Sequence, residues 1–153
     1  MQVKLDEVEK AIIRELLANA RLSFREIARR IGTSTATVAN KVKKLEEEGV
    51  IKGYTAVVDA EKLGYDIAAV IEIVISRGKV TEVEEDVARM PNVQAVYDVT
   101  GQSDAIVIAR FKSRTELSKF IKKLLSMEHV ERTITHIVLN VRKEESLSPH
   151  LVE

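Results

Sequence analysis

The amino-acid sequence predicts an α+β protein in two parts, three helices followed by a smaller domain of strands and helices. Apolar residues recur every three or four positions as far as residue 49, and short apolar runs typical of strands alternate with helical segments after residue 66. The charge changes at the same place. Residues 1–53 carry 11 basic and 8 acidic side chains, net +3, whereas the rest carries 13 and 16, net −3. We therefore expect domains at residues 1–53 and 67–153, joined by a linker at residues 54–66.

Composition narrows the classes of protein that the chain can belong to. Of its 153 residues, 45% are hydrophobic and 31% charged, which is ordinary for a soluble globular protein. No apolar run approaches the roughly 20 residues of a membrane span, and the N-terminus does not resemble a signal peptide. The chain has no cysteine, so nothing favours an oxidising compartment. We expect a cytoplasmic protein.

Capping signals divide the first 53 residues into three helices. Asp6 and Ser23 each have a glutamate three residues later, as in a capping box, and Ser34 has the residue type of a third N-cap. Gly32 tolerates a left-handed conformation, so it predicts a sharp turn between the second and third helices. This order is typical of a three-helix or winged helix-turn-helix domain. The side chains expected to be buried are Val8, Ile12, Ile13, Leu16, Leu17, Phe24, Ile27, Ala28, Ile31, Val38, Val42 and Leu45.

The outer face of the third helix suggests an interface for nucleic acid. Seven basic residues and one acid lie between Arg21 and Lys44. With the apolar stripe inward, small and polar residues occupy the opposite face, and lysines follow them. Such a face fits a major groove, where asparagine can pair bidentately with adenine and lysines can neutralise phosphates. The candidates for contacts with base edges are Thr35, Thr37 and Asn40, and those for phosphates are Arg25, Lys41, Lys43 and Lys44. Ser34, the expected cap of the helix, is a further candidate DNA-binding residue. The alternative is a helical bundle with a solvated face.

The second domain is predicted to have the order βαββαβ of a ferredoxin-like sandwich. The spacing of a capping box occurs twice, at residues 81 and 84 and at residues 113 and 116. Pro91 should end the first of the two helices. The sequence YTAVVD, residues 54–59, has the composition of a short strand in the linker. The expected elements are strand 68–76, helix 81–90, strand 93–100, strand 104–111, helix 113–126 and strand 130–143.

Two strands of this domain are apolar on both faces. The sequences AAVIEIVI and AIVIA lack the polar alternation of a strand with one face in water. Two helices can cover only one face of a four-stranded sheet, so the other face needs a second cover. A second copy of the same sheet is the simplest cover, and we expect a two-fold homodimer.

Several motifs of the chain are characteristic of one protein family: LDE at the start of the first helix, EIA in the second, TV in the third, GVI after it, and the hairpin VTGQSDAIVIAR. On these motifs, residues 3–145 resemble the leucine-responsive regulator/AsnC (Lrp/AsnC) family of transcriptional regulators. Two positions in the first 53 residues depart from the family pattern. Thr33 replaces an aliphatic residue, and Lys41 replaces an arginine, which keeps the charge but loses a bidentate fork. Ser103 stands where an aromatic residue is frequent.

The resemblance implies a DNA-binding regulator that dimerises through its second domain and responds to an amino acid or a related small molecule. It also implies further assembly, to tetramers or octamers. The candidate effector-binding residues are Gly101, Gln102, Ser103, Asp104, Thr133 and Thr135. Turn N–H groups could bind a carboxylate, and Asp104 could bind an ammonium group. Alternatively, the turn is only a tight hairpin and the threonines are strand formers.

The sequence gives no support for an enzyme. Its three histidines lie seven and fourteen residues apart, without the local spacing of metal ligands, and no phosphate-binding loop or nucleophile motif occurs. We therefore predict no catalytic residue, metal or cofactor. The alternative to a DNA-binding regulator is a protein-interaction adaptor, or an amino-acid-sensing module that does not bind specific DNA. Affinity for DNA that falls steeply with salt would distinguish the regulator from both.

Overall fold

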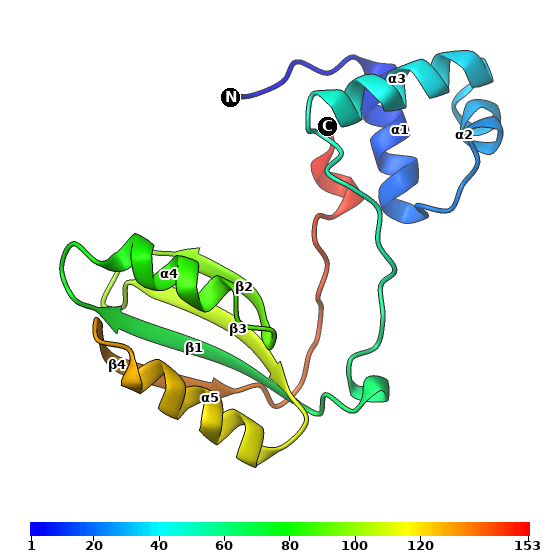
Figure 1. Cartoon of the computed structure of the whole chain (residues 1–153). Coiled ribbons are helices and arrows are strands. Elements are labelled where there is room, and N and C mark those ends of the chain that lie inside the picture. The colour runs from blue at the N-terminus through cyan, green and yellow to red at the C-terminus, as the bar shows by residue number, and fades with distance from the viewer. The chain divides into compact units, whose positions relative to one another are not determined.

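The computed structural model describes all residues from Met1 to Glu153. The chain forms two compact units, shown in Figure 1. The helical unit comprises Met1–Val57 together with Lys143–Glu153, and the sheet unit comprises Val58–Arg142. None of the helices is both long enough and apolar enough to cross a lipid bilayer.

The helical unit contains the three predicted helices, α1 (Glu7–Ala18), α2 (Phe24–Ile31) and α3 (Thr35–Glu47). The capping predictions are confirmed. Full capping boxes begin α1 and α2, and the Ser34 hydroxyl accepts the backbone N–H of Thr37 at the start of α3. Apolar side chains from all three helices and the loop after α1 form one core: Ile12, Leu22, Ile27, Ala28, Val38, Val42 and Leu45.

The turn between α2 and α3 is tight because Gly32 is left-handed, with φ of 74°. The N–H of Thr33 then donates to the carbonyl of Ala28 over 3.0 Å, which satisfies one of the free carbonyls at the end of α2. The predicted turn is therefore confirmed, and it sets the start of α3 directly after the end of α2.

Three expectations for this unit are wrong. Leu17, in the last turn of α1, is 37% exposed and is not part of the core. Phe24 is the first residue of α2 and is 39% exposed, because the contacts of α2 with the core begin one turn later, at Ile27. Residues 54–59 form no strand, and the helical unit contains no strand at all. An extended segment becomes a strand only when a neighbouring strand accepts and donates its hydrogen bonds, and none lies beside this one.

The sheet unit has the predicted order βαββαβ. Its elements are β1 (Ile67–Ile75), α4 (Val80–Ala88), β2 (Val93–Asp98), β3 (Ala105–Phe111), α5 (Arg114–Ser126) and β4 (Val130–Ile137). The strands lie in the order β2-β3-β1-β4, and all neighbours are antiparallel. A 3₁₀ turn, η1 (Glu61–Leu63), precedes β1.

Three details of this unit differ from the prediction. No capping box begins α4, since Lys79 is its N-cap and makes no side-chain bond there. Ser113 caps α5 as predicted, but the Glu116 carboxylate accepts the N–H of Lys112 instead of that of Ser113. The last strand ends at Ile137 and not at residue 143, because Ile137 faces Ala69 near the start of β1 and no strand continues beyond it.

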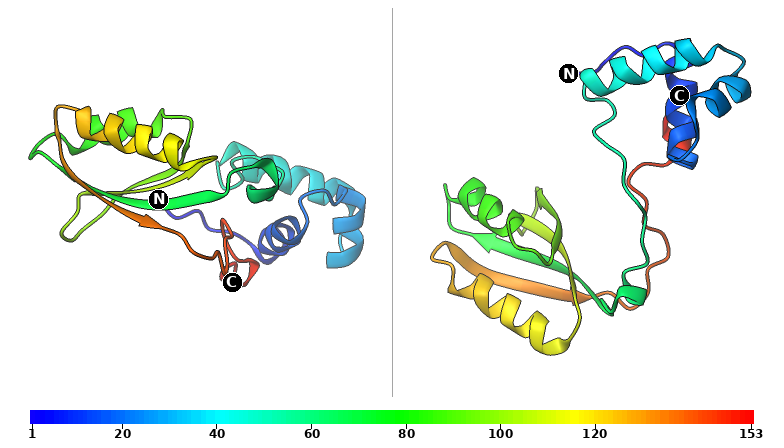
Figure 2. Two further views of the ribbon diagram at one scale, coloured as in Figure 1. Left: turned by 90° about the horizontal axis from the view of Figure 1, so that it is seen from below. Right: turned by 45° about the vertical axis from the view of Figure 1, so that its right-hand side comes forward.

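The two faces of the sheet have different surroundings (Figure 2). Helices α4 and α5 cover one face, and the core lies between them and the sheet, with Phe111 and Phe120 in contact at 5.1 Å between ring centroids. The other face, here called the open face, carries neighbouring apolar side chains such as Val70, Ile108 and Ile134. The expectation that these strands are apolar on both faces is confirmed.

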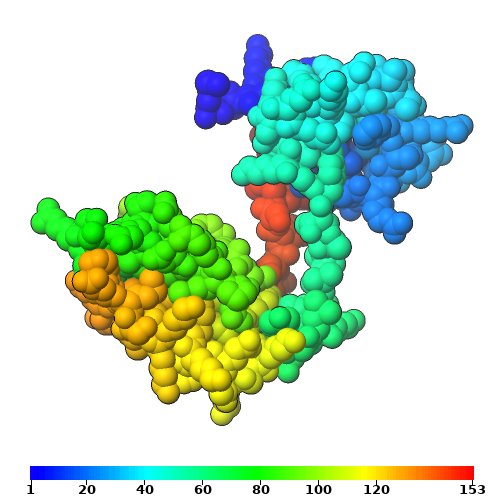
Figure 3. All heavy atoms as spheres, in the orientation of Figure 1, coloured from blue at the N-terminus to red at the C-terminus, as the bar shows by residue number.

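The last eleven residues pack with the helices, although the sequence assigned them to the domain at 67–153. A 3₁₀ turn, η2 (Pro149–Leu151), contacts α1, and the Arg14 guanidinium donates to the carbonyl of Val152 over 2.7 Å. Figure 3 shows these C-terminal residues, in red, against the helical unit.

Candidate nucleic-acid interface and effector turn

The start of α3 forms an open depression with α2. The depression has a volume of about 560 Å³ and is lined by Arg25, Glu26, Ala28, Arg29, Thr33, Ser34 and Thr35. The first N–H groups of α3 lie at this edge, where the helix dipole favours an anion. Arg25 is exposed and makes no hydrogen bond or ion pair within the chain. A phosphate could therefore meet both a free guanidinium and backbone N–H groups here.

The face of α3 opposite its buried stripe is polar and accessible, as predicted. Thr35 and Asn40 are exposed, and Lys43 is 75% exposed with only Glu47 near it, at 3.9 Å. The hydroxyls of Ser34 and Thr37 are 2.8 Å apart and bind one another, so both are partly occupied by the cap of the helix. Asn40 and Lys43 are the two long side chains of this face whose polar atoms remain available.

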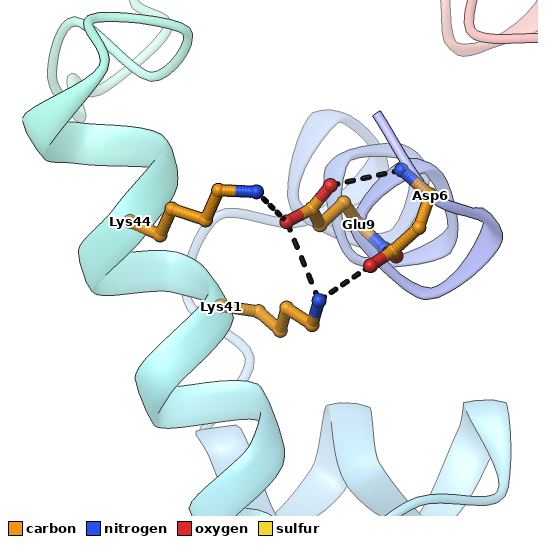
Figure 4. A network of polar contacts seen from close by, with 4 residues as sticks. All are labelled: Asp6, Glu9, Lys41 and Lys44. Atoms are coloured by element: carbon orange, nitrogen blue, oxygen red, sulfur yellow. Dashed lines mark hydrogen bonds and ion pairs between the residues drawn. The ribbon is translucent and has the colours of Figure 1, made fainter. Parts of the chain in front are cut away.

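Lys41 and Lys44 are paired with acidic side chains, whereas they were predicted to be unpaired cations that contact phosphates. Figure 4 shows both side chains extending from α3 toward the first turn of α1. Lys44 Nζ is 2.8 Å from Glu9 Oε1, and Lys41 Nζ contacts both Asp6 Oδ2 and, at 3.4 Å, Glu9 Oε1. The hydrogen bond to Lys41 lowers the pKa of Asp6, and the hydrogen bond to Lys44 lowers that of Glu9. Two of the four predicted phosphate ligands are thus paired within the chain.

Sequence reasoning missed these acids. The capping box at Asp6 and Glu9 was recognised only as the start of a helix, and its partners follow more than thirty residues later. A signal was present for Lys41 alone, because it lies beside the buried stripe of α3, whereas helical periodicity places Lys44 on the outer side together with Lys43.

The turn between β2 and β3 contains four of the predicted effector residues. Gly101 has φ of 123°, a conformation that other residues rarely adopt, and Gln102 is exposed beside it. One oxygen of the Asp104 carboxylate accepts the N–H of Ile75 over 2.7 Å, where the pairing of β1 is irregular. Asp104 therefore supports the sheet, with its second oxygen still available.

Ser103 is buried and belongs to a polar group on the open face. Its hydroxyl donates to Glu72 Oε1 over 2.9 Å, and Glu72 Oε2 lies 2.7 Å from His136 Nε2. The hydrogen bonds from His136 and Ser103 lower the pKa of Glu72. No local sequence pattern indicates this group, since β1, β4 and the turn come together only in the folded sheet.

Thr133 and Thr135 share one face of β4, as predicted, and both are partly buried. They pair with Ile73 and Ile71, so they lie on the helix-covered side of the sheet, opposite to Glu72. Within one chain, Ser103 and the two threonines therefore do not line a single pocket.

Glu84 of α4 is a further acid beside the turn that the sequence did not single out as a site residue. Burial raises its pKa, and the charges of Asp98 and Asp104 raise it further. One of its carboxylate oxygens is buried without a hydrogen-bond partner. An acidic environment therefore surrounds the end of the turn, where a cation would be favoured.

Two known families match separate parts of the chain. Residues 5–52 match the family described as winged helix-turn-helix DNA-binding, and residues 68–147 match the Lrp/AsnC ligand binding domain. The chain belongs to the Lrp/AsnC family. It is a helix-turn-helix transcriptional regulator with a ligand-binding domain, as the resemblance implied.

Individual relatives cover nearly the whole chain. An HTH-type transcriptional regulator of Pyrococcus abyssi is 45% identical over 141 residues, which are 92% of this chain and 96% of the relative. The structure of Escherichia coli AsnC has a TM-score of 0.88 at 26% identity and covers 96% of this chain and 100% of that one. A transcriptional regulator from Neisseria meningitidis, solved in complex with L-Met, has a TM-score of 0.85 at 27% identity and covers 94% and 95%.

Proposed function

We propose that this Lrp/AsnC regulator binds duplex DNA with α3 in the major groove. The observation that supports it most is the accessible polar face of α3, where Asn40 and Lys43 point away from the buried stripe. Thr35, Thr37 and Asn40 contact base edges, since short side chains let the helix approach and an amide can pair with adenine. Ser34 lies at the same edge, as the cap of the helix.

The phosphate contacts come mainly from Arg25 and Lys43, because Lys41 and Lys44 are paired with carboxylates of α1. Arg25 lies beside the depression at the start of α3, and Lys43 lies further along the same helix. Cations on both sides of the base-contacting residues would fix the helix in the groove, because phosphate contacts set position while base contacts set sequence.

We propose further that two chains dimerise through the open faces of their sheets. The apolar side chains of this face include Val70, Ile108 and Ile134, and a monomer would leave them beside water. A two-fold axis presents two copies of α3, so the binding site should be roughly palindromic, with half-sites about one helical turn apart. Larger assemblies, tetramers or octamers, would be built from such dimers.

An amino acid or a related molecule is proposed as the effector, bound near the turn of residues 101–104 and near Thr133 and Thr135. The family description of residues 68–147 as a ligand-binding domain and the L-Met complex of the Neisseria relative support this class of ligand. The acidic environment of Glu84 and Asp104 suits an ammonium group. Because Ser103 and the two threonines lie on different sides of one sheet, we infer that a neighbouring dimer completes the site.

Selection of bound sequences from random duplex DNA tests the proposal, with and without a mixture of amino acids. We expect a roughly palindromic sequence to be enriched, and its enrichment to change with the mixture. Absence of any enriched sequence, together with an affinity that does not depend on salt, would instead identify the chain as a protein-interaction adaptor.

A further inference from the structure

The first turn of α1 and the recognition helix α3 share one network of charged groups (Figure 4). Glu9 is only 1% exposed, and its two oxygens have separate partners. Oε2 accepts the backbone N–H of Asp6 over 2.9 Å, and Oε1 accepts from Lys44 and Lys41. Asp6 Oδ1 in turn accepts the N–H of Glu9 over 2.8 Å, while Oδ2 binds Lys41. The acidic cap of α1 is thus also the partner of two cations from α3.

The two lysines are nevertheless close to solvent. The side chain of Lys44 is 46% exposed and that of Lys41 is 29% exposed, whereas the carboxylate of Glu9 lies beneath them. A long flexible side chain of this kind can turn outward at little cost once its partner is removed. Both ammonium groups would then be available on the flanks of α3, next to the face that carries Asn40 and Lys43.

We propose that Asp6 and Glu9 compete with DNA phosphates for Lys41 and Lys44, and so limit how strongly the protein binds any duplex. This inference rests on the proposed function of α3. A carboxylate and a phosphate oxygen are alternative acceptors for the same ammonium group. While the acids hold the lysines, each protomer offers fewer cations to the phosphates, and sequence-independent affinity is lower. The base contacts are unaffected, so the competition favours specific over excess non-specific binding.

The capping chemistry of α1 makes a clean test possible. Glutamine replaces glutamate in a capping box, and asparagine is as good an N-cap as aspartate. Glu9→Gln and Asp6→Asn therefore keep the start of α1 while removing the charge that holds Lys44 or Lys41. Glu7→Gln is the matched control. It removes the same charge from the same turn, but Glu7 is 83% exposed in its side chain and binds only Lys10 of its own helix.

The experiment measures the affinity of each full-length variant for a duplex of random sequence as a function of salt, by fluorescence anisotropy. If one lysine of each protomer is released and contacts one DNA phosphate, a dimer gains two phosphate contacts. The slope of log K against log salt should then become steeper by about 1.8. Relative to the unmodified protein, the gain in affinity at about 50 mM salt should be about 12-fold larger than at about 200 mM. Glu7→Gln should leave the slope unchanged.

Three outcomes would contradict the inference. Slopes of Glu9→Gln and Asp6→Asn equal to that of the unmodified protein would show that the lysines do not reach phosphates when released. A slope for Glu7→Gln that is equally steep would show a general effect of charge. A loss of affinity for the selected sequence alone, with random DNA unaffected, would show that the acids orient α3 and do not compete with phosphate.

The design separates this inference from the proposed function. If the unmodified protein binds no duplex even at low salt, the proposed function fails. If it binds and only the variants behave unexpectedly, the competition fails. Asp6 is half-exposed, so Asp6→Asn provides the test even if Glu9→Gln destabilises the core, which thermal unfolding of each variant would reveal.

Discussion

The division of roles between Asn40 and Lys43 can be tested by two substitutions one helical turn apart on α3. In Lys43→Ala, a side chain that is 75% exposed loses a charge whose only neighbouring acid, Glu47, lies 3.9 Å away. This charge is therefore almost fully available to phosphate, and its removal from both protomers should reduce the salt slope by about 1.8. The affinity should fall by the same factor for every sequence.

Asn40→Ala should change the sequence preference of the protein and not the salt dependence of its affinity. The salt slope should stay the same, while the preference for one base pair in each half-site should fall by about 1–3 kcal/mol, the worth of a bidentate contact. Fluorescence anisotropy with the selected duplex, with a duplex altered at that base pair, and with random DNA measures both quantities. If the two variants change slope and preference in the same way, the assignment of separate roles is wrong.

Three further predictions concern stability and assembly. The pKa values of Asp6 and Glu9 are lowered in the fold, so the two carboxylates contribute fully to the free energy of unfolding above the ordinary carboxyl range near pH 4. This contribution is lost as the pH falls through the lowered pKa values, and urea unfolding as a function of pH should show the loss. In Glu9→Gln the free energy of unfolding should depend less on pH over this range. Asp104→Ala leaves the buried N–H of Ile75 without an acceptor and should lower the free energy of unfolding by about 1–3 kcal/mol, whereas Asp104→Asn should restore part of the loss, both measured by urea unfolding. Ile108→Lys places a charge on the open face, so size-exclusion chromatography with light scattering should give a folded monomer of 17.1 kDa, and a dimer that persists would exclude this face as the interface.

Local signals in the sequence were sufficient to predict most of the fold. Asp6, Ser23 and Ser34 cap the three helices because their side chains compete for backbone N–H groups within three residues, which is a property of the local sequence. Gly32 likewise adopts the left-handed conformation that its position suggested. The order βαββαβ followed from the alternation of apolar runs and helical segments.

Local patterns failed where a distant partner decides the outcome. Thr81 and Glu84 have the spacing of a capping box, yet the helix begins at Val80, Lys79 is its N-cap, and one oxygen of Glu84 is buried without a hydrogen-bond partner. Residues 54–59 have the composition of a strand but no neighbour to pair with. The length of β4 was overestimated for the same reason, because its partner β1 sets where pairing stops.

The candidate site shows the same limit. The exposed face of α3 follows from helical periodicity, and Asn40 and Lys43 lie on it as predicted. The pairing of Lys41 and Lys44 with Glu9 depends on how α1 crosses α3, which no local pattern contains. The contact of Ser103 with Glu72 likewise depends on the register of three strands.

A crystal structure of the protein bound to the duplex that selection identifies would test the central claim most directly. We predict a two-fold dimer joined through the open faces of its sheets, with both copies of α3 in successive major grooves on one side of the duplex. The Asn40 amide should lie about 3 Å from a base edge, and Lys43 should lie against a phosphate. A complex in which α3 faces away from the DNA, or in which Asn40 contacts only the sugar-phosphate backbone, would contradict the account.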